Sequence, residues 1–169
     1  MPLDIQELGS LSELIAALAT LATLAYLALQ IRQNTRAIRG STLHSVTQTQ
    51  QNELHWGGEI AGVFTKAIEN QTALTPVEAW QMSEWLMSAM AARQNEYVQY
   101  RDGHITQEVW EASENIIRIV ASFDWGRNWW VTFGNKSFSV EFVALVDELM
   151  GRDRIVNLKD VVQGLMEFD

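Results

Sequence analysis

The chain contains an uncharged run of eighteen residues, Leu14 to Ile31, and its first three basic residues, Arg32, Arg36 and Arg39, follow directly. As a helix, eighteen residues cover about 27 Å, which is close to the ~30 Å hydrocarbon thickness of a bilayer. Positive charge beside such a run is typical of its cytoplasmic end. The sequence therefore predicts a single membrane-spanning helix whose C-terminal side lies in the cytoplasm.

Two other interpretations of this run are a cleaved signal peptide and a buried helix of a soluble domain. A signal peptide carries positive charge before its apolar run, whereas Asp4, Glu7 and Glu13 precede this one. A buried helix is the stronger alternative, because alanine and threonine make the run only moderately hydrophobic. Its length and its flanking charges favour the membrane.

The predicted membrane helix has two different faces at about 100° per residue. Leucines cover one face, and small or polar side chains form a narrow stripe on the other. Helices in a bilayer associate by packing small residues and by sharing polar hydrogen bonds. We predict a helix-association seam at this stripe, which consists of Ser12, Ala16, Ala19, Thr23, Tyr26 and Gln30.

The three arginines fall on the leucine face if the same helix continues beyond the run. There the helix should leave the hydrocarbon, where guanidinium groups meet lipid phosphates. We therefore expect Arg32, Arg36 and Arg39 to contact lipid headgroups. An ordinary solvated cluster of arginines is the alternative.

Three parts are predicted along the chain: an N-terminal segment with the membrane helix (1–32), a helical stalk (33–56) and a cytoplasmic α-helical domain (57–169). Gly40 is the weakest point of the stalk, and Gly57-Gly58 is the clearest helix breaker. No segment alternates like a strand, so we predict an all-α fold in which the membrane helix continues into a helical bundle. Apolar spacing and capping signals predict further helices from Ile60 to Ile68, Thr75 to Arg101, Thr106 to Val120, Phe123 to Phe133 (a short helix or turn), Ser139 to Gly151, and over 152–169.

The charge distribution argues against nucleic-acid binding. The formal net charge is −9, and the first forty residues sum to zero, so residues 41–169 hold the whole negative excess. Nucleic-acid binding draws most of its strength from basic patches. The chain contains no cysteine, which excludes disulfides and thiolate metal sites.

The sequence offers no catalytic, cofactor or metal site, and we expect a protein that is not an enzyme. His44, His55 and His104 are far apart in the sequence, and no two of them lie at metal-ligand spacing. The acidic pairs Glu111/Glu114 and Asp147/Glu148 are typical of solvated helix surfaces.

The aromatic cluster Trp125, Trp129, Trp130 and Phe133 is the least generic feature of the C-terminal part. Its members could serve as docking or interfacial aromatics, because indole joins an apolar body to a polar edge. Packing in the core is the default for side chains of this size.

The segment Tyr26-Leu-Ala-Leu-Gln-Ile-Arg-Gln-Asn-Thr-Arg-Ala37 resembles the signature of an uncharacterised bacterial family of single-pass membrane proteins with a helical cytoplasmic domain. Further features that resemble this family are Tyr97 to Gly103, Trp110, Arg127 to Trp130 and Ser139 to Phe142. Phe123-Asp-Trp125 departs from the family, which often has proline and glycine before the paired tryptophans. The resemblance implies the fold and the topology, and it implies no activity.

These observations favour a non-enzymatic inner-membrane protein with a periplasmic N-terminus and a cytoplasmic domain. Its expected partners are membrane lipids and either copies of itself, as a homo-oligomer, or other membrane-complex subunits, to which it would be an accessory subunit. One alternative is a homo-oligomeric channel whose pore is lined by Ser12, Thr23 and Gln30. Another is a lipid-acting enzyme with a pocket near the membrane that contains Arg93, Glu96 or His104.

Overall fold

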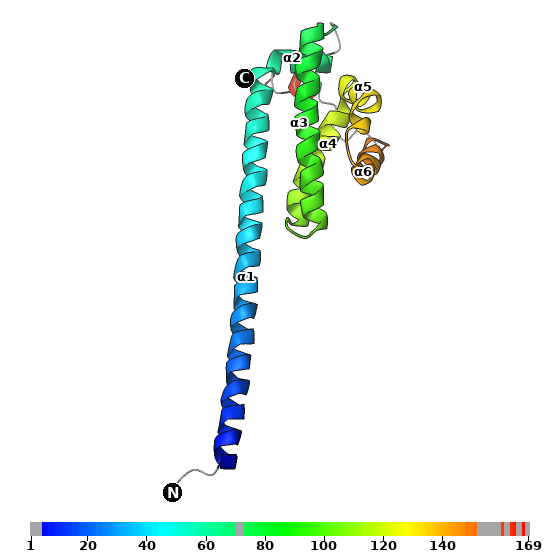
Figure 1. The fold of residues 1–169 in the computed structure, drawn as a ribbon. Helices are drawn as coiled ribbons and strands as arrows, with labels where there is room; N and C mark the ends of the chain where they lie inside the picture. Colours follow the sequence, from blue (N-terminus) through cyan, green and yellow to red (C-terminus); the bar gives the residue numbers. More distant parts are fainter. Residues whose placement is uncertain (1–4, 70–72, 152–159, 161–162, 165–166, 168–169) are drawn as a thin grey trace. The chain divides into compact units, whose positions relative to one another are not determined.

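The computed structural model describes residues 5–69 and 73–151, together with positions 160, 163, 164 and 167. Within these residues the secondary structure is helical and contains no strand, which confirms the all-α prediction. The helix predicted over 152–169 lies largely outside the described residues. The helices are α1 (Ile5–Glu59), α2 (Ala61–Glu69), α3 (Pro76–Arg101), α4 (Gln107–Ser122), α5 (Asp124–Thr132), the 3₁₀ helix η1 (Gly134–Lys136) and α6 (Val140–Gly151) (Figure 1).

Helix α1 is continuous through all three glycines that were expected to weaken or break it. It passes Gly40, Gly57 and Gly58 and ends at Glu59, where α2 begins after a single turn residue, Ile60. A glycine inside a helix costs about 1 kcal/mol, which is a weakening and not a stop signal. The predicted break at Gly57-Gly58 is therefore wrong by two residues.

The chain forms two compact units, Met1–Ser41 and Thr42–Asp169. The C-terminal unit begins fifteen residues before the predicted domain start at Gly57. Val46 and Glu53, both in the predicted stalk, are buried and explain this difference. Residues 42–56 of the predicted stalk thus lie in the C-terminal unit.

A capping box stands at the start of α3, which was predicted at Thr75. Thr75 precedes Pro76, and its side chain accepts a hydrogen bond from the backbone N–H of Glu78, whose carboxylate accepts one from the Thr75 N–H at 2.8 Å. A hydrogen bond from Lys66 and the bonds from Thr75 lower the pKa of Glu78 to about 2. After α3, Gly103 has φ of 75°, a conformation that favours glycine and ends the helix.

The core of the C-terminal unit lies where α3, α5 and α6 meet α4, which contacts all three (Figure 1). Helix α3 contributes one face at helical spacing, with Met82, Leu86 and Met90 fully buried. The large side chains that complete this core are Ile117 and Val120 of α4, Trp130 of α5, and Phe142 and Val146 of α6.

The aromatic segment forms α5, and most of its rings pack inward. Trp129 and Trp130 are buried, and their indole N–H groups donate to Ser83 Oγ and Asp147 Oδ1, both at 2.8 Å. The docking interpretation is therefore wrong for these two residues, because their apolar bodies and polar edges are already satisfied inside the domain. Trp125 is half-buried, and Phe133 is 49% exposed and keeps the interfacial interpretation open.

Candidate functional site

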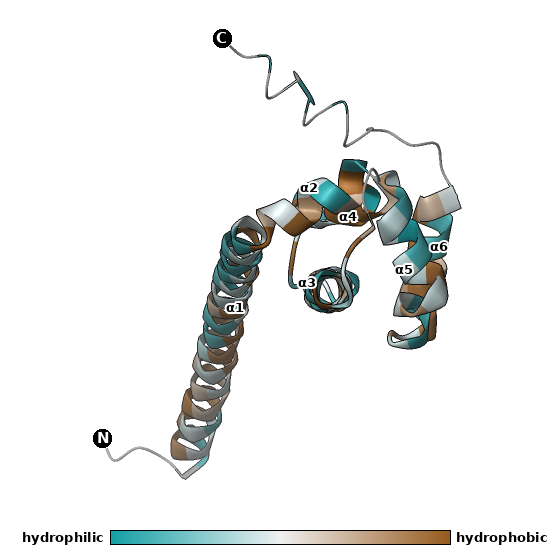
Figure 2. Ribbon diagram, turned by 90° about the horizontal axis from the view of Figure 1, so that it is seen from above, coloured by the Kyte–Doolittle hydropathy of each residue, from teal (hydrophilic) through white to brown (hydrophobic). Residues whose placement is uncertain are grey.

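The N-terminal unit is the most unusual surface of the molecule, because no side chain whose exposure the structure describes there is buried. These side chains, Gln6 and all from Leu8 to Ser41, are exposed, and the large ones of the apolar run are included. Helix α1 is the one described helix that is long and apolar enough to cross a membrane. Hydrophobic residues appear in brown along the N-terminal half of α1 in Figure 2. The exposed large residues are Leu8, Leu11, Leu14, Ile15, Leu18, Leu21, Leu24, Tyr26, Leu27, Leu29 and Ile31.

The polar groups of the predicted seam have hydrogen-bond partners within their own helix. The hydroxyl of Ser12 donates to the Gly9 carbonyl at 2.7 Å, and that of Thr23 donates to the Ala19 carbonyl at 2.8 Å. Gln30 Nε2 donates to the Tyr26 hydroxyl at 2.7 Å. Such bonds let these residues enter hydrocarbon, where an unpartnered donor is costly.

Arg32, Arg36 and Arg39 are exposed, and none forms an ion pair with another described residue. They are basic groups at one end of an exposed apolar surface. This is the arrangement that snorkelling side chains use to reach a lipid headgroup layer.

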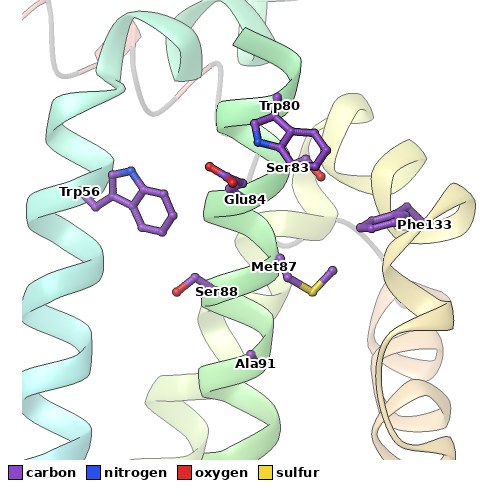
Figure 3. A pocket seen from close by; sticks show the side chains of 8 residues that line it. All are labelled: Trp56, Trp80, Ser83, Glu84, Met87, Ser88, Ala91 and Phe133. Atoms are coloured by element: carbon purple, nitrogen blue, oxygen red, sulfur yellow. The ribbon is translucent and has the colours of Figure 1, made fainter. Parts of the chain in front are cut away.

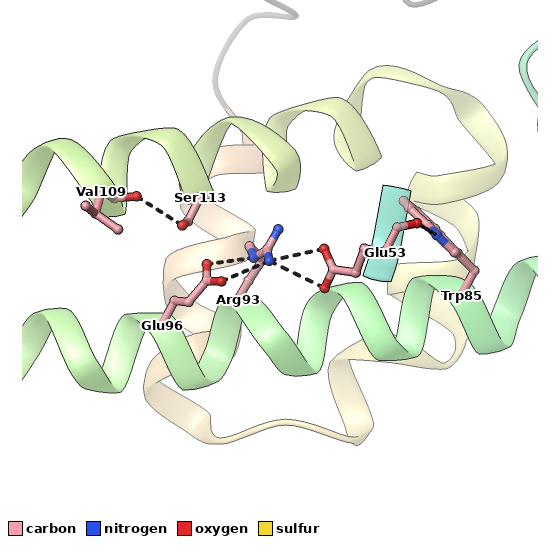
Figure 4. A network of polar contacts seen from close by, with 6 residues as sticks. All are labelled: Glu53, Trp85, Arg93, Glu96, Val109 and Ser113. Carbon is pink, nitrogen blue, oxygen red and sulfur yellow. Dashed lines mark hydrogen bonds and ion pairs between the residues drawn. The ribbon is translucent and has the colours of Figure 1, made fainter. Parts of the chain in front are cut away.

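The C-terminal unit contains a buried group of three charged residues, Glu53, Arg93 and Glu96, which we call the ion triad (Figure 4). Arg93 is 0% exposed, Glu96 2% and Glu53 7%. Glu96 contacts the guanidinium with both oxygens, at 2.8 Å from Nε and 3.0 Å from Nη2. Glu53, from α1, contacts the same Nη2 at 3.2 and 3.4 Å. The triad therefore joins the C-terminal part of α1 to α3.

Burial raises the pKa of Glu53 to about 7. The positive charge of Arg93 lowers this pKa, and the negative charge of Glu96 raises it. Arg93 Nη1 is buried and has no hydrogen-bond partner among the described residues. A carboxyl group in this environment can take up or release a proton near neutral pH.

Arg93 and Glu96 were expected only as members of a membrane-proximal enzyme pocket with His104. The structure brings the first two together, whereas His104 is exposed. Arg93 and Glu96 continue the helical spacing of the apolar residues Met82, Leu86 and Met90. This pattern in the sequence indicates that both are buried. Glu53 had no such signal, because its segment looks like a polar stalk.

Two pockets flank α3 in the C-terminal unit. The first, which we call the aromatic groove, has a volume of about 530 Å³ and lies along an exposed face of α3, with three aromatic side chains in its wall (Figure 3). The second, which we call the interhelix pocket, has a volume of about 480 Å³ and includes the ion-triad residue Glu53 in its wall. The aromatic groove is lined by Trp56, Trp80, Ser83, Glu84, Met87, Ser88, Ala91 and Phe133. The interhelix pocket is lined by Gln50, Glu53, Leu54, Gly57, Gly58, Trp85, Ala112, Ile116 and Ile119.

The remaining sequence candidates do not come together. Glu111 accepts a hydrogen bond from Gln107, and Glu114 pairs with Arg118. Asp147 binds the Trp130 indole. In the part of the chain that the structure describes, no three His, Cys, Asp or Glu side chains are placed to hold a metal ion. No protein family, curated protein or solved structure matches this chain.

Proposed function

We propose that the chain is a membrane-anchored assembly protein. The N-terminal part of α1 crosses a bacterial inner membrane, and the helical domain from Thr42 onward lies in the cytoplasm. In this proposal the protein has no catalytic role and acts as a homo-oligomer or as an accessory subunit of a larger membrane complex.

The observation that carries the proposal is the exposure of the apolar run. Burial of one leucine or isoleucine side chain is worth about 1.5–3 kcal/mol, and ten such residues between Leu8 and Ile31 are about half exposed. Leaving them in water would cost on the order of 10 kcal/mol. In this proposal acyl chains or other helices cover this surface, since the N-terminal unit does not bury it against itself.

The flanking positive charge supports the proposed orientation, and the seam supports the proposed assembly role. Arg32, Arg36 and Arg39 follow the apolar run, and cytoplasmic ends of membrane helices carry such excess positive charge. The seam offers a close approach for a second helix, because its central side chains, Ala16, Ala19 and Thr23, are small.

The experiment that tests the proposal is mild solubilisation of native membranes, followed by mass measurement of the purified complex and identification of every chain in it. We expect the protein to require detergent and to migrate as several copies or with a stoichiometric partner. A chain that stays water-soluble and monodisperse without any amphiphile would contradict the membrane anchor. A detergent-solubilised single copy would contradict the assembly role alone.

A further inference from the structure

The ion triad has a net negative charge that its own members do not balance. Arg93 supplies one positive charge against the two carboxylates, and Glu96 takes its shorter contacts. Among the described residues, the charged groups that act on Glu53 are Arg93 and Glu96. The excess negative charge is therefore located at Glu53, in a buried position where an unbalanced charge is costly.

Glu53 is also one of the residues that line the interhelix pocket, whose remaining wall is mostly apolar. Helix α4 contributes Ala112, Ile116 and Ile119 at helical spacing, and all three of these residues are uncharged. Gly57 and Gly58 add no side chains to the α1 wall beyond those of Gln50, Glu53 and Leu54, and this keeps the space open. The volume of about 480 Å³ is within the range of pockets that hold small organic ligands.

We propose that the interhelix pocket binds a small organic monocation, with its ammonium group beside Glu53 and its apolar body between α1 and α4. The positive group balances the excess charge of the ion triad, and the apolar body covers the faces of Ile116 and Trp85. Neither α1 nor α4 has to move to form this site.

Other ligand classes fit this pocket less well. A calcium ion needs six to eight oxygen ligands, whereas Glu53 and Gln50 are the only lining residues with side-chain oxygens. An anion is repelled by Glu53. A neutral apolar molecule fills the space but leaves the charge of the triad unbalanced.

The test uses the full chain in neutral detergent and three probe cations: phenethylammonium, cyclohexylmethylammonium and benzyltrimethylammonium. Binding is measured by calorimetry against phenethyl alcohol, the neutral analogue of the first probe. We expect at least one cation to bind with about tenfold or greater preference over the alcohol, because the charged contact is made in a site of low dielectric. Glu53→Gln should remove this preference.

Two matched variants separate this pocket from the rest of the domain. Ala112 and Ala91 are both exposed helical alanines, and they line the interhelix pocket and the aromatic groove respectively. Ala112→Phe should fill the interhelix pocket and abolish cation binding, whereas Ala91→Phe should leave it unchanged. Because Ala112→Phe does not alter the ion triad, it keeps the test valid if Glu53→Gln fails to fold.

Protons should compete with the ligand, since both neutralise the same carboxylate. Burial raises the pKa of Glu53 to about 7, so cation binding should weaken as the pH falls from about 8 to about 6. The proposal is overturned if none of the three cations binds at millimolar concentration. It is also overturned if cation and alcohol bind equally, or if Ala91→Phe and Ala112→Phe have the same effect.

Discussion

Arg93 occupies a core position of α3, in register with Met82, Leu86 and Met90, and it is fully buried. A buried charge is stable only when it is paired with an opposite charge. Arg93 is paired with two carboxylates, and burying these carboxylates without Arg93 would be costly as well. The residue thus links the C-terminal part of α1, through Glu53, to its own helix, through Glu96. At the scale of single residues, this contact dominates the electrostatics of the domain.

Replacing Arg93 should be one of the most destabilising single changes in the domain. Arg93→Met leaves Glu53 and Glu96 buried without a counter-charge, and we expect the free energy of unfolding to fall by about 3–5 kcal/mol. Arg118→Met is the matched control, because its partner Glu114 is partly exposed and such pairs contribute about 1 kcal/mol or less. Chemical denaturation in detergent measures both variants. Equal losses would contradict the role assigned to the triad.

Stability should also depend on pH through Glu53. Its pKa is about 7 in the folded domain, above the ordinary value of 4.5. Protonated Glu53 therefore makes its full contribution to the free energy of unfolding below about pH 4.5, and this contribution is lost as the pH rises through about 7. We expect a decrease on the order of 2 kcal/mol across this window. Glu53→Gln should flatten this part of the pH profile, and an unchanged profile would show that another group titrates.

A side chain at Gly126 should disturb the junction of α4 and α5. A Cβ atom there would collide with the Val120 carbonyl oxygen and would lie 3.0 Å from the Phe123 ring. We expect Gly126→Ala to cost about 1–3 kcal/mol of unfolding free energy, as overpacking does. Gly58→Ala meets nothing within 4 Å and should be neutral or stabilising by up to about 1 kcal/mol. Thermal unfolding compares them, and similar melting temperatures would count against this packing.

At the scale of helices, signals that act within one turn could be predicted from the sequence. Thr75, Pro76 and Glu78 fix the start of α3, and Gly103 follows its end, so α3 lies within one residue of the predicted helix from Thr75 to Arg101. The continuation of α1 past Gly57 could not be predicted. The low helix propensity of glycine weakens α1 at Gly57. The burial of Val46 and Glu53 against residues distant in the sequence outweighs this loss of helix stability. The same non-local contacts place Glu53 in the ion triad.

The two faces of the apolar run of α1 should respond differently to the same enlargement. Leucine at Ala16, Ala19 and Thr23 adds bulk to the seam, and we expect association in detergent to weaken by about tenfold or more. Leucine at Ala17, Ala25 and Ala28, on the opposite side, is the control and should leave association unchanged. Analytical ultracentrifugation measures both triple variants. Equal oligomer distributions for the two would contradict the seam.

At the scale of the whole molecule, the two units differ in how their apolar side chains are covered. The N-terminal unit has no buried side chain among those whose exposure the structure describes, and in the proposed function acyl chains cover its apolar residues. The C-terminal unit has a closed core of its own around Leu86, Ile117 and Phe142. The sequence indicated both properties, because an uncharged run and periodic helices are visible without tertiary contacts. The interhelix pocket was not predictable, because it depends on how α1, α3 and α4 pack.

The most direct test of the membrane anchor uses the absence of cysteine in the chain. Single cysteines at Gly9, Leu21 and Gln51 are exposed to a membrane-impermeant maleimide in intact and in permeabilised cells. We expect Gly9→Cys to react from outside, Gln51→Cys to react only after permeabilisation, and Leu21→Cys to react only after denaturation, because acyl chains exclude the reagent. Labelling of Leu21→Cys as fast as that of Gln51→Cys would contradict the account.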